Sequence, residues 1–351
     1  MHSSSSIVAA ETAVANQTGT GTATAPGRQR RLPWLPALIA GLVLALLPLV
    51  LPSYLQDLVL KIVIYAIFAL SLELLVGTTG LVSLGHAAFF GIAAYITVLA
   101  TPETGPASLP LLIVLAMAGA GAYALVVGAL SLRTRGVYFI MVTLAFAQMA
   151  YFIFHDTNLG GGSDGIFLLF RPVLAIGGLV LLDLENAQHL YFTALGALGL
   201  VYLFLALLQR SRFGHALAGI RANEQRMRAA GYGTYRYKLA AFVIAAMLAA
   251  VAGVLLTVKN GTVNPELLSW HESGAVLLMI ILGGLGSLRG AVLGAAAFIL
   301  LKEFYSSEAV FGVFAQRWQL TLGLTMIFFV ALLPKGLIGL RQRFKRTRGQ
   351  S

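Results

Sequence analysis

Long apolar runs recur along this chain, and their length constrains its fold more than any other feature. Leu190–Leu208 and Leu239–Val258 are two clear examples. Each is close to the roughly 20 residues with which a helix crosses the hydrocarbon core of a bilayer. The chain is 58% hydrophobic and 11% charged, which leaves too few polar residues to cover a soluble protein of this size. We therefore predict an all-α polytopic membrane protein with about ten transmembrane helices, within a range of about eight to ten.

The candidate spans differ in how continuous they are. Two neighbouring ones, 272–288 and 290–304, are short and rich in glycine, so they form either two spans or one broken or re-entrant element. The other candidates cover residues 33–52, 57–76, 81–100, 109–131, 136–155, 189–209, 239–258 and 318–333.

Basic residues are concentrated in alternate connections between these spans. If the N-terminus is inside, most of the 24 Lys and Arg residues fall in cytoplasmic segments and most acidic residues fall outside, as the positive-inside rule requires. Both termini are therefore predicted to be cytoplasmic. The net charge of +11 then reflects membrane topology, and no nucleic-acid partner is expected.

The two ends of the chain differ in composition from its middle. Residues 1–32 are rich in Ser, Thr, Ala and Gly and are predicted to form a disordered cytoplasmic tail. The apolar run that follows is longer than the core of a signal peptide, so we expect an uncleaved anchor. Residues 33–340 are predicted to form the transmembrane domain, with an external loop at 156–188 and a cytoplasmic loop at 210–238. Residues 341–351 are predicted to be a basic cytoplasmic tail.

Several kinds of chemistry are excluded by what the sequence lacks. It contains no G-x-x-x-x-G-K-[ST] phosphate loop, no H-E-x-x-H and no G-x-S-x-G, so the usual nucleotide, zinc-protease and hydrolase sites are not expected. It also contains no cysteine, which rules out disulfides and thiolate ligands. We predict no catalytic residues, no metal site and no cofactor in this chain.

Two glycine-rich stretches within the apolar regions predict broken helices. In GTTGLVSLGHAAFFGIAAY, which starts at Gly77, polar groups interrupt the run, and polar groups at membrane depth need partners or water. The second stretch is LGGLGSLRG. The candidate translocation pathway comprises Gly80, Ser83, Gly85, His86, Gly283 and Gly284. The alternatives are helix packing for the glycines and a backbone carbonyl partner for His86. Glu73, near the cytoplasmic end of its span, either reaches water or has a function.

The external loop contains a second glycine-rich feature. Gly161, Gly162, Ser163 and Asp164 follow the fifth candidate span. The sequence allows two interpretations, a flexible turn or a contact with an external partner or substrate.

The cytoplasmic loop 210–238 carries seven basic residues and a single acidic one, Glu224. Its residues from Gly214 to Ala230 favour a helix, with Leu217, Ile220 and Met227 on one face and Gly231 as a C-cap. We therefore predict one short amphipathic helix at the cytoplasmic membrane face. It would either lie on anionic lipid or dock into a cleft of a cytosolic partner.

Several motifs, in order, resemble one family. They are GLVSLGHAAFFGIAAY, RGVYFIMVTLAFAQM, NLGGGSDGI, GIRANEQRMRAAGYGTYRYKLAAFVIAAMLAAVAGVL and ILGGLGSLRGAVLGAA. Over about Leu58 to Leu340 the chain is similar to the Liv-type permeases of branched-chain amino acid ABC importers. The resemblance implies a multi-pass pore subunit of the bacterial inner membrane without chemistry of its own. It also implies a second permease, two cytoplasmic subunits that bind ATP, and an extracytoplasmic binding protein that delivers the small-molecule substrate.

The resemblance also assigns roles within the cytoplasmic loop. The ATPase-coupling motif of the family maps onto Asn223, Glu224 and Gly231, with Arg221 just before it. Met227 and Arg228 depart from the family pattern, where an Ala and an acid are common, so this loop is more cationic. In the implied mechanism, ATP closes the cytosolic dimer, the loop helix moves with it, and the path opens alternately to each side.

The sequence leaves the transported solute open. A urea or short-amide ABC permease is one alternative, and an ion-coupled secondary transporter is another, although the latter is expected to place paired acidic residues within the membrane. An apolar solute path need not be selective if an external protein chooses the cargo.

Overall fold

The computed structural model describes residues 41, 44, 46–49, 51–176, 179–333 and 336–339. Within this part, six helices are long and apolar enough to cross a membrane, and a strongly bent helix pair raises the number to seven. The predicted all-α membrane fold is therefore confirmed, whereas a count of about ten is not. The tails 1–32 and 341–351 and most of the first candidate span, 33–52, lie outside the described residues.

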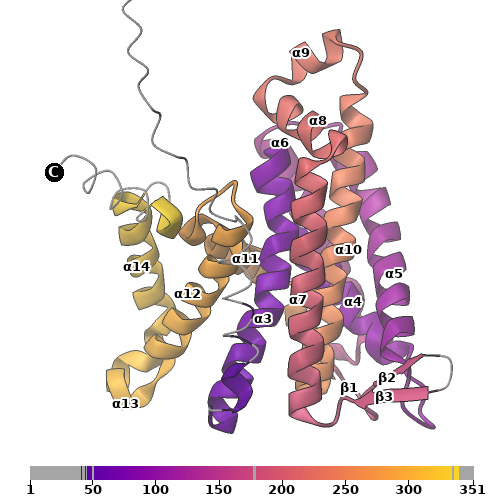
Figure 1. The fold of residues 1–351 in the computed structure, drawn as a ribbon, viewed down its shortest axis with the longest axis vertical. Helices are drawn as coiled ribbons and strands as arrows, with labels where there is room; N and C mark the ends of the chain where they lie inside the picture. The colour runs from indigo at the N-terminus through magenta and orange to yellow at the C-terminus, as the bar shows by residue number, and fades with distance from the viewer. Residues whose placement is uncertain are drawn as a thin grey trace, which may run out of the picture. The chain divides into compact units, whose positions relative to one another are not determined.

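Two long helices occupy the centre of the described fold (Figure 1). Helix α3 (Ser53–Glu73) continues into the π-helical turn η2 (Leu74–Thr79), and α10 (Thr234–Asn260) packs against it. Within the most apolar 18 residues of each helix, 78% of the residues are buried in α3–η2 and 72% in α10. In α6 (Val137–Asp156) the corresponding share is 22%. Helices that are apolar on every side are the ones a membrane bundle can place at its centre.

Aromatic and small side chains join the central helices to α4 (His86–Leu99). Phe68 of α3 stacks on Phe90 of α4 with ring centroids 4.5 Å apart, and Phe89 meets Phe242 of α10 edge-on at 5.4 Å. A Cβ added at Gly253 of α10 would overlap the backbone of α4. This glycine therefore lets the two helix backbones approach closely, which is the main source of helix association in lipid.

The outer helices present apolar faces to their surroundings. Helix α5 (Leu109–Ser131) packs on α10 and α4, and α7 (Ala187–Arg210) packs on α3. Helix α14 (Trp318–Leu332) packs on α11 (Trp270–Gly283) and α12 (Leu288–Ser306). Side chains such as Leu200 and Phe328 are 70% and 62% exposed, as expected for helix faces that contact lipid tails or other membrane helices.

Two glycine-rich regions that held candidate spans are interrupted, as their glycines and polar residues indicate. Helix α4 has only 14 residues and begins at His86, so the prediction of a full span at 81–100 is wrong. Helices α11 (Trp270–Gly283) and α12 (Leu288–Ser306) are bent by 116° across a four-residue break, which selects the broken or re-entrant alternative over two separate spans.

The predicted external loop contains short strands. Strand β1 (Ile166–Phe167) pairs with β4 (Thr262–Val263), which follows α10, and β2 (Val173–Ile176) forms an antiparallel hairpin with β3 (Leu179–Asp183). The remaining short elements are η1 (Leu47–Leu49), η3 (Asn158–Gly160), η4 (Gly162–Asp164), η5 (Pro265–Leu268), α13 (Glu308–Phe311) and η6 (Gly312–Arg317).

Candidate functional site

The basic loop between α7 and α10 folds into two helices, α8 (Arg212–Ala222) and α9 (Glu224–Ala229). The prediction of one continuous amphipathic helix is wrong because Asn223 has an extended backbone, with φ −158° and ψ 100°. Its side-chain oxygen accepts a hydrogen bond of 2.9 Å from the N–H of Arg226. Asn is a strong N-cap residue, so it ends α8 and starts α9.

Glu224 fastens α9 to the first turn of α10. Its carboxylate accepts hydrogen bonds from Arg228 at 2.6 Å, Lys238 at 2.7 Å and Thr234 at 3.2 Å. Partial burial raises the pKa of Glu224, but these three donors outweigh it and hold the pKa below its ordinary value of 4.5. Charged at neutral pH, Glu224 is thus the centre of a small ion-pair network.

Gly231 ends α9 in the manner predicted. Its φ is +85°, a left-handed conformation that costs a residue with a side chain more than it costs glycine. The N–H of Gly231 donates to the Arg228 carbonyl at 2.9 Å and that of Tyr232 to the Met227 carbonyl at 3.0 Å, which is the Schellman pattern. The loop therefore has a defined conformation that depends on Asn223, Glu224 and Gly231.

Arg221 links this loop to the central helix. From the last turn of α8, its Nη1 donates a hydrogen bond to the carbonyl of Gly77 in η2. The same side chain passes over Gly80, where a Cβ would lie 3.3 Å from Arg221 Cγ. Gly80 has a φ of +75° and ends η2. Gly80, one of the candidate pathway residues, therefore lies against the basic loop.

Glu73 lies one turn before Gly77 and is fully buried, so the interpretation that it reaches water is wrong. Its Oε1 accepts a hydrogen bond of 2.6 Å from the N–H of Gly286, in the break between α11 and α12. This contact joins two broken elements that are 213 residues apart in the sequence.

The other candidate pathway residues are buried between helices in this conformation. His86 is fully buried, shares a hydrogen bond of 2.8 Å with Ser71 of α3 and stacks on Phe68, so its partner is a hydroxyl and not the carbonyl we expected. Ser83 accepts from the Gly85 N–H at 3.2 Å. A Cβ at Gly85 would overlap the Thr143 carbonyl.

The glycines of the second stretch lie at a close helix crossing. A Cβ at Gly283 would overlap the Gly290 carbonyl, and Gly284 has a φ of 112°. Both features are those of close packing at a bend. A role of these six residues in the translocation pathway stays a prediction.

The glycine-rich turn at residues 161–164 lies at the opposite end of α10 from α9. Gly161, Ser163 and Asp164 are exposed and Gly162 is half-buried. The β1–β4 pairing follows the turn directly in the sequence. Before the turn, Phe154 stacks on Tyr95 of α4 with ring centroids 4.1 Å apart. Since α10 has 27 residues and rises about 1.5 Å per residue, its ends are roughly 40 Å apart. The turn and the basic loop are thus separated by roughly the thickness of a bilayer.

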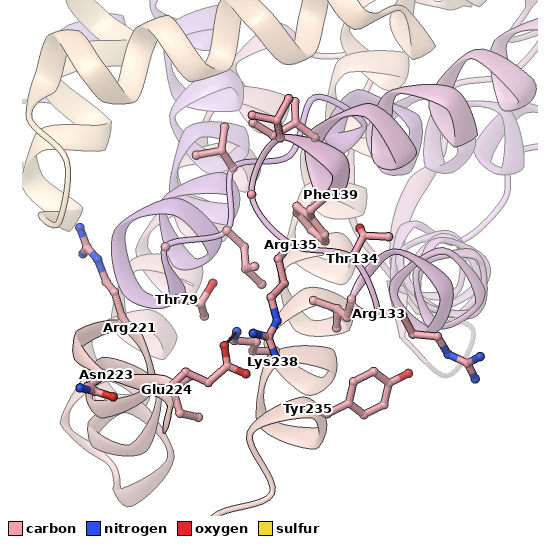
Figure 2. Close-up of a pocket in the computed structure, with 18 of the residues that line it drawn as sticks. Thr79, Arg133, Thr134, Arg135, Phe139, Arg221, Asn223, Glu224, Tyr235 and Lys238 are labelled. Carbon is pink, nitrogen blue, oxygen red and sulfur yellow. Dashed lines mark hydrogen bonds and ion pairs between the residues drawn. The ribbon is translucent and has the colours of Figure 1, made fainter. Parts of the chain in front are cut away.

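A pocket of about 820 Å³ opens beneath the basic loop (Figure 2). It is lined by η2 and the following segment, by the connection between α5 and α6, by α8 and α9, and by the start of α10. Figure 2 shows the ends of Arg135, Glu224 and Lys238 turned toward the middle of the pocket. Arg133 and Arg135 also border this pocket. The sequence gives no sign of this, because no local pattern connects them to Glu224, about 90 positions further along the chain.

Comparison with known proteins decides the family. The family model described as "Branched-chain amino acid transport system / permease component" matches residues 54–331. The chain belongs to this permease family. It is therefore a multi-pass membrane permease subunit of an ABC importer, and the family resemblance of the motifs is confirmed.

Named relatives of this permease come from several bacteria. The chain is 31% identical over 323 residues to the high-affinity branched-chain amino acid transport system permease protein LivM of Escherichia coli, covering 86% of this chain and 74% of LivM. It is 25% identical to BraD of Pseudomonas aeruginosa, covering 82% and 96%, and 25% identical to LivH of Escherichia coli, covering 78% and 91%. No solved structure matches the chain. All three relatives are named as transport permease proteins, and membership of an ABC importer family implies partner subunits.

Proposed function

We propose that this permease carries branched-chain or closely related amino acids across the inner membrane of a bacterium, and that two separate cytosolic ATPase subunits drive it through α8 and α9. The observation that carries this proposal is the basic loop itself. It is braced by Glu224, capped by Asn223 and Gly231, and connected by Arg221 to the central helix.

A brace of this kind suits the transmission of force. A loop that moved freely would absorb a push from a partner, whereas α9 is tied to α10 through Lys238 and α8 is tied to η2 through Arg221. A displacement of the loop would therefore move α3 and α10, which form the centre of the bundle. Such gating by rigid elements is the usual basis of alternating access.

The remaining subunits follow from the same proposal. ATP is held by the partner ATPases, and this chain supplies neither a nucleotide site nor catalytic groups. A second permease subunit completes the pore, and an extracytoplasmic binding protein delivers the solute to the side of the turn at residues 161–164. The names of the relatives favour branched-chain amino acids over urea or short amides.

The test is uptake of labelled leucine by proteoliposomes that contain the assembled transporter with ATP inside and the binding protein outside. We expect uptake that requires ATP hydrolysis and is inhibited by excess valine or isoleucine but not by urea. Inhibition by urea alone would favour the short-amide alternative. Uptake without ATP but with an ion gradient would favour a secondary transporter, and either result would overturn the proposal.

A further inference from the structure

Three irregular points of the fold meet around one buried carboxylate, that of Glu73. They are the π-helical turn η2, the end of α8 and the break between α11 and α12, and the residues that join them are Glu73, Gly77, Arg221 and Gly286. We call these four residues the Glu73 junction. A second pocket, of about 480 Å³, borders three of them and is also lined by Thr78 and Gln209.

Only one of the two carboxylate oxygens of Glu73 accepts a hydrogen bond from a described residue. Its Oε1 accepts from the Gly286 N–H at 2.6 Å, and the N–H of Ser287 faces the same carboxylate. Its Oε2, by contrast, accepts no hydrogen bond from any described residue. A buried acid is expensive within a membrane helix, and an unused acceptor adds to that cost.

Arg221 is near Glu73 without being paired to it. The guanidinium attracts the carboxylate electrostatically, yet no salt bridge joins the two among the described residues, and Arg221 Nη1 donates to the Gly77 carbonyl instead. Gly77 and Glu73 lie one helical turn apart on the same element. Arg221 thus lies near two alternative acceptors, the Gly77 carbonyl that it uses and Glu73 Oε2, which accepts no hydrogen bond from a described residue.

The space at Gly77 completes the geometry. A Cβ added at Gly77 would overlap the Glu73 carboxylate. The carboxylate therefore occupies the space that a side chain at residue 77 would take. In this position it accepts the hydrogen bond from the Gly286 N–H. Any larger residue at this position would push the carboxylate away from the α11–α12 break.

From this geometry we infer that Glu73 is a positioning residue of the transport cycle, which connects movement of α8 to the break between α11 and α12. This inference rests on the proposed coupling role of the basic loop. When α8 is displaced, Arg221 moves from the Gly77 carbonyl to Glu73 Oε2, and the carboxylate releases the Gly286 N–H. The guanidinium is charged in both arrangements, so the change exchanges one charge-assisted hydrogen bond for another.

The direct test is Glu73→Gln in the assembled transporter. Glutamine keeps the shape of the side chain and an oxygen for the Gly286 N–H, but it removes the charge that attracts Arg221. We expect ATP hydrolysis by the partner subunits to continue while the number of solute molecules transported per ATP falls several-fold. An unchanged transport-to-hydrolysis ratio would overturn the inference, because a purely structural Glu73 would not alter coupling.

A second variant tests the same point without a change of charge. Gly77→Ala is expected to displace the carboxylate and to lower the same ratio. The matched control is Gly274→Ala in α11, where a Cβ would have open space, and it is expected to transport like the unmodified protein. Co-purification with the partner subunits shows whether each variant assembles. If Glu73→Gln does not assemble, Gly77→Ala decides, and equal ratios for Gly77→Ala and Gly274→Ala would overturn the inference.

A double-mutant cycle with Arg221→Gln tests the connection itself. If the two side chains act through each other, the effects of Glu73→Gln and Arg221→Gln on the ratio are not additive, whereas residues that act independently would give additive effects. Uptake by the unmodified transporter distinguishes a failure of the proposed function from a failure of the role of Glu73. Absence of ATP-driven uptake there contradicts the proposed function, and normal uptake with additive effects contradicts only the role of Glu73.

Discussion

Lys238, in the first turns of α10, places its Nζ 2.7 Å from Oε2 of Glu224, which is 14 residues earlier at the start of α9. Both side chains are largely buried, with 17% and 24% of their surface exposed. The bond closes the turn that contains Gly231 and makes α9 and the beginning of α10 one unit. Because α10 is a central helix of the bundle, this ion pair connects the proposed docking surface to the membrane core.

The first prediction concerns the charge of Glu224. Glu224→Lys replaces the common acceptor of Arg228, Thr234 and Lys238 with a third cation, and we expect uptake to be abolished while membrane insertion continues. Each charge-assisted hydrogen bond lost from a partly buried site costs about 2 kcal/mol. Uptake assays and membrane fractionation of the variant measure the two effects.

The matched control for this variant is Gln225→Lys, which adds the same charge at the exposed neighbouring position. We expect it to retain more activity than Glu224→Lys. Equal loss in both would mean that the surface charge of the loop matters, and not the brace that Glu224 forms.

The second prediction concerns the backbone at Gly231. Gly231→Val forces a β-branched residue into a conformation with φ of +85°, at a cost of about 1–2 kcal/mol. We expect uptake to fall sharply because α9 loses its C-terminal turn. Gly199→Val in α7 is the control, since a Cβ there has open space. Normal uptake by the Gly231 variant would refute the assigned role of the Schellman turn.

The third prediction is a dependence on pH. The pKa of Glu224 is lowered in the folded protein, so its contribution to the stability of the loop is fully present above its ordinary pKa of 4.5. That contribution is lost as the pH falls below 4.5 and through the lowered folded value. The protection of the α9 amides against hydrogen exchange, relative to the intrinsic exchange rate at each pH, is expected to be high at neutral pH and to fall in this acidic range. Glu224→Gln is expected to remove the acidic transition, and an identical pH profile for the variant would contradict the assignment.

The fourth prediction concerns topology. The chain contains no cysteine, so single cysteines can be labelled without background. A membrane-impermeant thiol reagent added to intact cells is expected to label Ser163→Cys and not Gln225→Cys, and the order is expected to reverse in inside-out vesicles. Labelling of both positions from one side would contradict the placement of the two loops at opposite ends of α10.

Regular parts of the fold were predictable because their signal is local. The spans 57–76, 109–131, 136–155, 189–209 and 239–258 each correspond to a helix within a few residues at most ends, since about 20 apolar residues suffice to define a transmembrane helix. Gly231 was also predictable, because a glycine after a helix-forming run is the common C-cap.

Other parts depend on contacts that no local pattern encodes. The Gly286 N–H that binds Glu73 is 213 residues away, and the start of α4 at His86 is fixed partly by Ser273 of α11, which accepts from the Ala87 N–H at 2.8 Å. The break at Asn223 is different in kind. Asn is a preferred N-cap residue, so the sequence contained a signal for this break. The helix-forming residues on both sides of Asn223 favoured one continuous helix instead.

The most direct measurement of the central claim is cross-linking from α9 in native membranes. A Gln225→Cys variant, modified with a short photoreactive group and co-expressed with the partner genes, is expected to form an adduct with an ATP-binding subunit whose yield changes when ATP is added. Ser163→Cys, treated in the same way, is expected to form none. If Gln225 gave no adduct with an ATP-hydrolysing protein while Ser163 did, the coupling role of α8 and α9 would be contradicted.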